Sequence, residues 1–280
     1  MDKKMFGVYA FFMTALLLLY PFYSGNSLAS MVHTLPKSCN APKAADVQVD
    51  QNKASAIFVM DDGWKSEYTT AYPILKKYGF KGNISVIPSR VDKENYITYK
   101  QLQNLYENEE WDLLNHTYHH KKLTSLDKDE QEKEIMKTTK WLDNNCYSRG
   151  RKVLIYPYGA YNKDTLAILK KHHFVSARTL SETELPKNTF PRYKVEVHNL
   201  TDPEQINYSK QIIDKAITAK GTIVFVNHRF SKGEKKIDDP MYYPEQQFEE
   251  LVRYLSEKKD KIEVLTYTEW FQKNAENKTK

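Results

Sequence analysis

Several features that would point to a specific class of protein are missing from this 280-residue chain. It contains two cysteines, Cys39 and Cys146, and neither belongs to a Cys-x-x-Cys pair, which argues against a zinc site built from cysteines. It has no Gly-x-Gly-x-x-Gly fingerprint of dinucleotide binding. Its lysines and arginines are scattered rather than clustered. The formal charge of +6 therefore indicates a basic surface, and no nucleic-acid partner is expected.

Only one apolar run is long enough to suggest export or membrane insertion. Residues 5–23 are uncharged and mostly apolar, lysines precede them, and small residues follow at Ser27 and Ala29. This order predicts a signal peptide over residues 1–29, and the length of the run offers a retained membrane anchor as the alternative. In both cases we expect the remainder outside the cytoplasm, secreted, in the cell wall or at the outer face of the membrane. A Cys39–Cys146 disulfide is then permitted, with two unpaired thiols as the alternative.

From residue 54 onward, apolar runs alternate with helix-like segments. Residues 30–53 lack periodicity and are predicted to be a spacer, and residues 273–280 a polar tail. The predicted strands are residues 55–60, 82–87, 111–116, 152–157, 193–197, 222–228 and 261–266. The predicted helices are residues 68–79, 98–109, 125–145, 163–173, 202–221 and 244–259.

This alternation predicts βαβ units and a parallel sheet. Six or seven such units in about 220 residues favour one α/β domain with a distorted (β/α) barrel over two domains. An open doubly wound sheet is the competing arrangement. In either fold the chemistry should lie at the C-terminal ends of the strands.

Polar residues occur where four of the predicted strands end. They are Asp61 and Asp62, then His116, His119 and His120, then Tyr156–Gly159, and finally Asn227 and His228. One carboxylate and two imidazoles form a three-ligand set for a zinc-like ion and leave a position open for water and substrate. The spacing alone allows His116 to act with either His119 or His120.

These residues resemble the motifs of the polysaccharide deacetylases (the NodB-homology domain, carbohydrate esterase family 4). "VMDDG" is similar to the family's "TFDDG", "HTYHH" to its His-Ser/Thr-x-x-His, "YPYG" to its third motif, and "VNH" to its last. The resemblance spans residues 54–272 and points to a branch of the family that carries "YPYG". It implies a (β/α)7-type barrel that removes acetyl groups from N-acetylated sugars with a divalent metal, Zn²⁺ first, with Co²⁺ or Ni²⁺ as alternatives.

The resemblance also implies a role for each matching residue. Asp62, His116 and His120 would bind the metal, Asp61 would be the catalytic base and His228 the general acid. His119 would then be a bystander, and Thr117 would brace the ligand loop.

The third motif is expected to contact the substrate. The backbone N–H of Tyr158 would stabilise the developing oxyanion, and Pro157 and Gly159 would lie against the sugar. Trp64 is a further candidate for substrate binding, because aromatic rings stack on sugar faces.

The chain departs from the family pattern in two motifs. The third motif usually opens with an arginine that pairs with the catalytic base, and Ile155 occupies that position here. Arg178 is the candidate replacement, because a buried carboxylate needs a partner. The fourth motif is not evident, and Glu196 is a candidate for its acidic residue. We interpret these departures as a subtype of the family.

The sequence therefore predicts an exported, metal-dependent hydrolase, a monomer, that removes N-acetyl groups from N-acetylglucosamine units of a cell-wall or extracellular polysaccharide. Two alternatives remain. One is an O-acetyl esterase of the xylan type with the same site, and the other is a catalytically inactive carbohydrate-binding domain.

Overall fold

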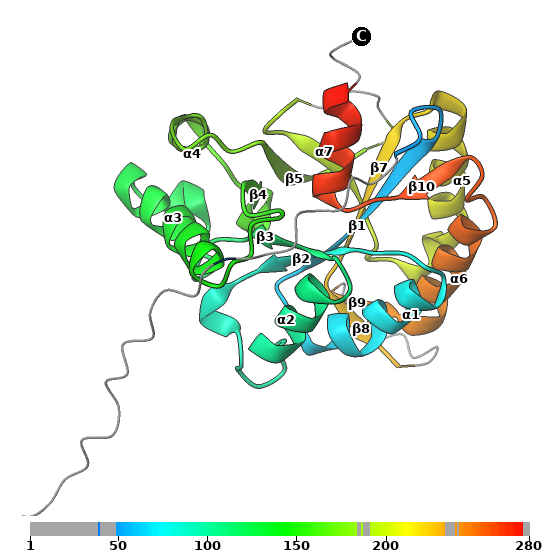
Figure 1. The fold of residues 1–280 in the computed structure, drawn as a ribbon, viewed down its shortest axis with the longest axis horizontal. Coiled ribbons are helices and arrows are strands. Elements are labelled where there is room, and N and C mark those ends of the chain that lie inside the picture. Colours follow the sequence, from blue (N-terminus) through cyan, green and yellow to red (C-terminus); the bar gives the residue numbers. More distant parts are fainter. Residues whose placement is uncertain are drawn as a thin grey trace, which may run out of the picture. The chain divides into compact units, whose positions relative to one another are not determined.

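Seven parallel strands close into a barrel, as Figure 1 shows for the computed structural model. They are β1 (Ala54–Asp61), β2 (Asn83–Val86), β3 (Asp112–Asn115), β4 (Val153–Ile155), β5 (Ser176–Glu182), β6 (Val195–Asn199) and β7 (Thr222–Asn227). The barrel closes because β1 pairs with β7 as well as with β2. A further strand, β10 (Ile262–Val264), pairs with the start of β1. The predicted parallel (β/α)7-type barrel is confirmed.

The structure describes residues 39, 49–183, 186, 191–232, 239 and 241–276, all within the unit formed by residues 36–280. The predicted signal peptide or anchor and most of the predicted spacer lie outside these residues. Among the helices of the described part of the chain, none has both the length and the apolar composition needed to cross a bilayer. Cys39 and Cys146 form a disulfide, one of the two alternatives that the sequence allowed.

Helices follow most of the strands and cover the outside of the barrel (Figure 1). They are α1 (Tyr72–Lys77) with the preceding π-helical turn η1 (Glu67–Ala71), α2 (Tyr99–Glu107), α3 (Lys128–Asn144), α4 (Lys163–Lys171), α5 (Ile206–Ala219), α6 (Glu245–Ser256) and α7 (Tyr267–Glu276). Side-chain caps start several of them. Thr98 and Gln101 form a capping box on α2, and Asp127 accepts the Glu130 N–H at the start of α3.

Four of the strands and helices, β5, β8, β9 and α7, were not among the predictions. β5 contains Ser176, Arg178 and Thr179, and these polar residues hid a buried strand. The short pair β8 (Arg229–Ser231) and β9 (Tyr242–Pro244) follows β7. α7 runs to Glu276, so the first residues of the predicted polar tail are helical, and Lys273 is buried with its Nζ 2.6 Å from Glu263 Oε1.

Alternate residues of each strand face the barrel interior. In β1, Ile57 and Val59 belong to the interior cluster, whereas Phe58 and Met60 pack outward with residues of the surrounding helices. Strand side chains alternate with a period of two, so Asp61 continues the interior row at the end of β1. The fold therefore points this carboxylate into the mouth of the barrel.

Candidate active site

The same alternation brings polar residues from four strands together. Val59 precedes Asp61 in β1, Leu114 precedes His116 after β3, and Val226 precedes His228 after β7, each two residues earlier in the interior row. In β5, Ala177 packs outward, so Arg178 faces the interior. Residues distant in sequence therefore converge at the C-terminal edge of the sheet.

Asp62 reaches the site through a change in backbone direction. It would point outward if β1 continued, but its φ is 81° and that of Gly63 is 73°. A positive φ is unfavourable for a residue with a side chain, and such residues often occur at functional sites. The turn places Asp62 Oδ1 3.6 Å from His116 Nε2 and 3.2 Å from His120 Nε2.

The loop after β3 decides which histidines face Asp62. The Asn115 side chain accepts the Thr117 N–H, and the Thr117 hydroxyl accepts the His120 N–H at 3.1 Å. His120 therefore turns toward Asp62. His119 turns away, because its Nδ1 lies 2.7 Å from Glu134 Oε1 of α3 and its N–H donates to the other Glu134 oxygen.

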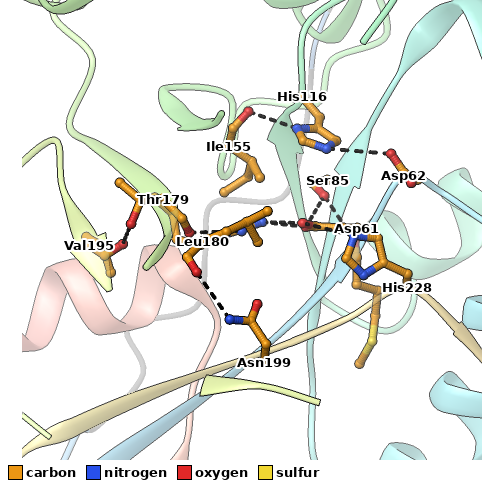
Figure 2. Close-up of polar contacts among 12 residues, drawn as sticks. Asp61, Asp62, Ser85, His116, Ile155, Thr179, Leu180, Val195, Asn199 and His228 are labelled. Atoms are coloured by element: carbon orange, nitrogen blue, oxygen red, sulfur yellow. Dashed lines mark hydrogen bonds and ion pairs between the residues drawn. The ribbon is translucent and has the colours of Figure 1, made fainter. Parts of the chain in front are cut away.

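Asp62, His116 and His120 fit a divalent metal ion. Their ligand atoms all lie within 4.8 Å of one another. His116 Nδ1 lies 2.8 Å from the Ile155 carbonyl oxygen, which can only accept, so Nδ1 carries the proton and the Nε2 lone pair faces Asp62 (Figure 2). Asp62 Oδ1 is buried and accepts no hydrogen bond from the described residues.

Both imidazoles are neutral at pH 7, the form in which histidine binds metal. Burial lowers the pKa of His116 to about 4. Burial and then the charge of Arg90 lower the pKa of His120 to about 4.

Asp61 is buried beside a cation. Its Oδ1 accepts a hydrogen bond from Arg178 Nη2 at 2.6 Å. Oδ1 also accepts one from Ser85 Oγ at 2.6 Å, and Oδ2 lies 3.9 Å from His228 Nε2 (Figure 2). Burial raises the pKa of Asp61. The charge of Arg178 and the hydrogen bond from Ser85 outweigh it and hold this pKa well below its usual range. Asp61 is therefore ionised at neutral pH.

Arg178 lies directly across from the position where the family usually has its arginine. The pairing of β4 with β5 places Ile155 opposite Arg178. Arg178 is fully buried, and its Nη1 donates to the Thr179 carbonyl. Glu196 does not join the site, because Val195 and Val197 face the interior and Glu196 faces outward.

The turn after β4 places an exposed aromatic ring beside the donor set. Pro157–Gly159 form one turn of 3₁₀ helix in which Tyr158 has a φ of 58°. Gly159 has a φ of 65°, and a Cβ there would lie 2.9 Å from the backbone nitrogen of Leu180. The Tyr158 side chain is 62% exposed, and its ring centroid is 4.8 Å from that of His120. Among the hydrogen bonds between described residues, none uses the Tyr158 N–H.

Trp64 does not offer a surface for a sugar. Its ring stacks on Tyr96 with centroids 4.3 Å apart, and Arg229 Cζ lies 3.5 Å from the ring centroid. Two groups this close cannot share one face without overlapping, so they cover opposite faces. Stacking of a sugar on Trp64, expected from the sequence, therefore does not fit the structure.

His198, which has no evident partner in the sequence, lies in a second polar cluster. Its Nδ1 is 2.5 Å from Glu182 Oε1 and its Nε2 is 2.8 Å from Ser209 Oγ. The order serine, histidine, acid occurs in hydrolases, but Ser209 is 2% exposed within α5 and cannot reach a substrate. The cluster instead joins β5, β6 and α5.

Comparison with known proteins gives the same family as the motifs. Residues 48–177 match the polysaccharide deacetylase family. The chain is 30% identical over 134 residues to a putative polysaccharide deacetylase, YxkH, of Bacillus subtilis strain 168, covering 46% of this chain and 47% of that protein. It is 29% identical over 154 residues to the poly-β-1,6-N-acetyl-D-glucosamine N-deacetylase of Staphylococcus aureus strain MRSA252, covering 50% and 53%. The chain thus spans about half the length of these curated relatives.

A solved structure agrees with the fold. A putative polysaccharide deacetylase from Mycobacterium smegmatis aligns over 84% of this chain and 95% of its own, with a TM-score of 0.59 and 15% identity. At this identity the likeness concerns the closed barrel alone. The sequence match over residues 48–177 shows that this part of the chain is similar to the polysaccharide deacetylase family, and the Asp62, His116 and His120 donor set is consistent with that similarity.

Proposed function

We propose that this protein is a metal-dependent hydrolase that removes N-acetyl groups from N-acetylglucosamine units of a cell-wall or extracellular polysaccharide. The observation that carries the proposal is the donor set of Asp62, His116 and His120 beside the ionised, buried Asp61. The similarity over half its length to an N-deacetylase of a poly-N-acetylglucosamine supports this class of substrate.

Asp62 and the Nε2 atoms of His116 and His120 would hold the ion, with Zn²⁺ as the first expectation and Co²⁺ or Ni²⁺ as alternatives. A divalent ion supplies a bound water of lowered pKa and polarises the carbonyl of the acetyl group. Hydrogen bonding of His116 Nδ1 to the Ile155 carbonyl keeps the lone pair on the ligating nitrogen.

Asp61 would be the base that takes the proton of the attacking water. Arg178 and Ser85 fix its orientation and keep it ionised. His228 approaches Asp61 from β7, the other neighbour of β1, at 3.9 Å, and would protonate the leaving sugar nitrogen. One residue thus accepts a proton and the other donates one.

The turn after β4 would bind the reacting group and the sugar. The Tyr158 N–H is available to an oxyanion, and the exposed Tyr158 ring is a platform for a sugar face. The positive φ values of Tyr158 and Gly159 fix the direction of the Tyr158 N–H and ring. Pro157, the first residue of the turn, restricts the backbone because its ring fixes φ.

We further propose that the protein acts outside the cytoplasm as a monomer. The pattern of residues 1–29 supports export, and residues 5–23 would serve as the anchor if they are retained. The disulfide is consistent with an oxidising compartment.

The test is acetate release from chitooligosaccharides, β-1,6-linked poly-N-acetylglucosamine and peptidoglycan. We expect Asp61→Asn to lower the rate by about 10²- to 10⁴-fold on the accepted substrate. An unchanged rate in this variant would refute the role of Asp61 as base.

Two further measurements separate the alternatives. His228→Ala should reduce amide hydrolysis more than hydrolysis of an activated ester, because an alcohol needs less protonation than an amine when it leaves. Equal loss on both would refute the role of His228 as the acid, and faster acetate release from acetylated xylan than from the N-acetylated polymers would favour an O-acetyl esterase. A purified protein with no stoichiometric divalent metal, even after addition of zinc, would identify a binding domain instead of an enzyme.

A further inference from the structure

Trp64 connects the candidate metal ligand Asp62 to a stack of aromatic and cationic side chains. Its indole N–H donates to Asp62 Oδ2 at 3.1 Å. On one face it stacks on Tyr96, with which it also forms an isolated antiparallel bridge, and on the other it contacts the guanidinium of Arg229. The indole is therefore restrained on both faces and at its polar edge.

The stack extends beyond these three side chains. Arg229 Cζ lies 5.2 Å from the Tyr242 ring centroid and its Nη1 donates to the Tyr242 hydroxyl, which ties the stack to β9. Arg90 Cζ lies 5.4 Å from the Tyr96 ring centroid. A cation over an aromatic face is attracted to the ring quadrupole, so Arg229 and Arg90 each stabilise the position of the rings that they contact. The direction of the Trp64 N–H is consequently fixed by segments that follow β1, β2 and β7, including the short strands β8 and β9.

This arrangement distinguishes the two oxygens of Asp62. Oδ2 is engaged by Trp64, whereas Oδ1 faces the imidazoles of His116 and His120 and accepts no hydrogen bond from the described residues. Arg90 Nη1 is 3.3 Å from Oδ1 without hydrogen-bond geometry. The strained backbone of Asp62 also requires an external restraint. One N–H therefore determines which oxygen is presented to the donor set.

We propose that Trp64, clamped between Tyr96 and Arg229, is a positioning residue that orients Asp62 for metal binding. The inference rests on the proposed function, since it assigns a task within the same site. Trp64 would then not bind substrate. Tyr96 and Arg229 cover the two faces of its ring, and the N–H at the ring edge fixes the orientation of the metal ligand Asp62.

The test compares Zn²⁺ affinity of the full chain and its variants by competition with a chromophoric chelator. Trp64→Phe keeps an aromatic ring in the stack and removes the N–H. We expect its Zn²⁺ dissociation constant to rise by about 10-fold or more, the usual effect of losing such a partner. Trp141→Phe, on α3 against Tyr147, is the matched control and should bind as the wild type does. Acetate release by Trp64→Phe should recover toward the wild-type rate as Zn²⁺ is raised, which a general loss of structure would not permit.

Arg229→Gln is a second variant. It keeps the Trp64 N–H but removes the guanidinium that covers one face of the Trp64 ring. We expect a smaller increase of the dissociation constant, in the same direction. If the wild type binds one zinc per chain and Trp64→Phe binds it within twofold as tightly, the positioning role is overturned and the proposed function stands. If Trp64→Phe does not fold, unchanged affinity in Arg229→Gln overturns the inference. If the wild type binds no zinc, the proposed function fails, and the inference fails with it.

Discussion

Replacing Arg178 with methionine would leave the Asp61 carboxylate buried without its cation. Both side chains are almost fully buried, and the guanidinium contacts both carboxylate oxygens. Breaking a buried ion pair from one side costs about 3–5 kcal/mol in the free energy of unfolding, or roughly 6–20 °C in melting temperature for a domain of this size. Burial, which raises the pKa of Asp61, would then face less opposition.

Catalysis should respond in a defined direction. A higher pKa of Asp61 moves the acid limb of the pH–rate profile to higher pH, because the base must be ionised to accept a proton. Acetate release measured across pH, together with thermal unfolding, tests both effects. A variant with the wild-type melting temperature and pH profile would refute the pairing.

The register of β4 and β5 allows a sharper control. Ile155 lies opposite Arg178 and faces the interior. Ile155→Arg in the Arg178→Met background moves the cation to the neighbouring strand, where the family usually carries it. We expect the double variant to be more stable and more active than Arg178→Met, a non-additive result for residues in contact. Additive losses would show that Arg178 acts through something other than its charge near Asp61.

Two other side chains give separate predictions. Glu134→Ala removes both hydrogen bonds between the Glu134 carboxylate and His119. The loop would then hold the neighbouring ligand His120 less firmly, and we expect the Zn²⁺ dissociation constant to rise by about 10-fold. Glu130→Ala, at an exposed position, is the control, and equal affinities of the two variants would contradict this prediction. Burial raises the pKa of Glu67 well above its ordinary value of 4.5, so the unfolded chain loses this proton at lower pH than the folded protein does. The free energy of unfolding therefore falls as pH rises above about 4.5. In chemical denaturation, the free energy of unfolding of Glu67→Gln should therefore increase relative to that of the wild type as pH is raised from 5 to 8. Glu94→Gln, at an exposed position, should show no such increase. A difference between Glu67→Gln and the wild type that does not change with pH would disprove the prediction.

The barrel was predictable because most of its strands are uniformly apolar and are punctuated by helix-like segments. β5 was missed for a physical reason. Its interior row contains the polar Ser176 and Arg178, of which Arg178 contacts Asp61 in the site, so its sequence lacks the apolar signature. Arg178 could still be suggested, because a carboxylate at a buried strand end requires a partner.

The site was predictable as a set of residue types at strand ends, but not in its supporting contacts. The choice between His119 and His120 depends on Glu134, which lies on a different element from the motif. The proposed role of Trp64 depends on Tyr96 and Arg229, which are distant from it in sequence. No local sequence pattern predicts that both faces of its ring are covered.

The disulfide has a mechanical consequence. Tension applied to the chain ahead of Cys39 would be transmitted through the Cys39–Cys146 bond to the turn that follows α3. The bond thus gives a pull on the N-terminal side a point of attachment on the domain that is separate from β1, whose last residue is Asp61. Reduction of the bond would redirect the same force to the first residues of β1.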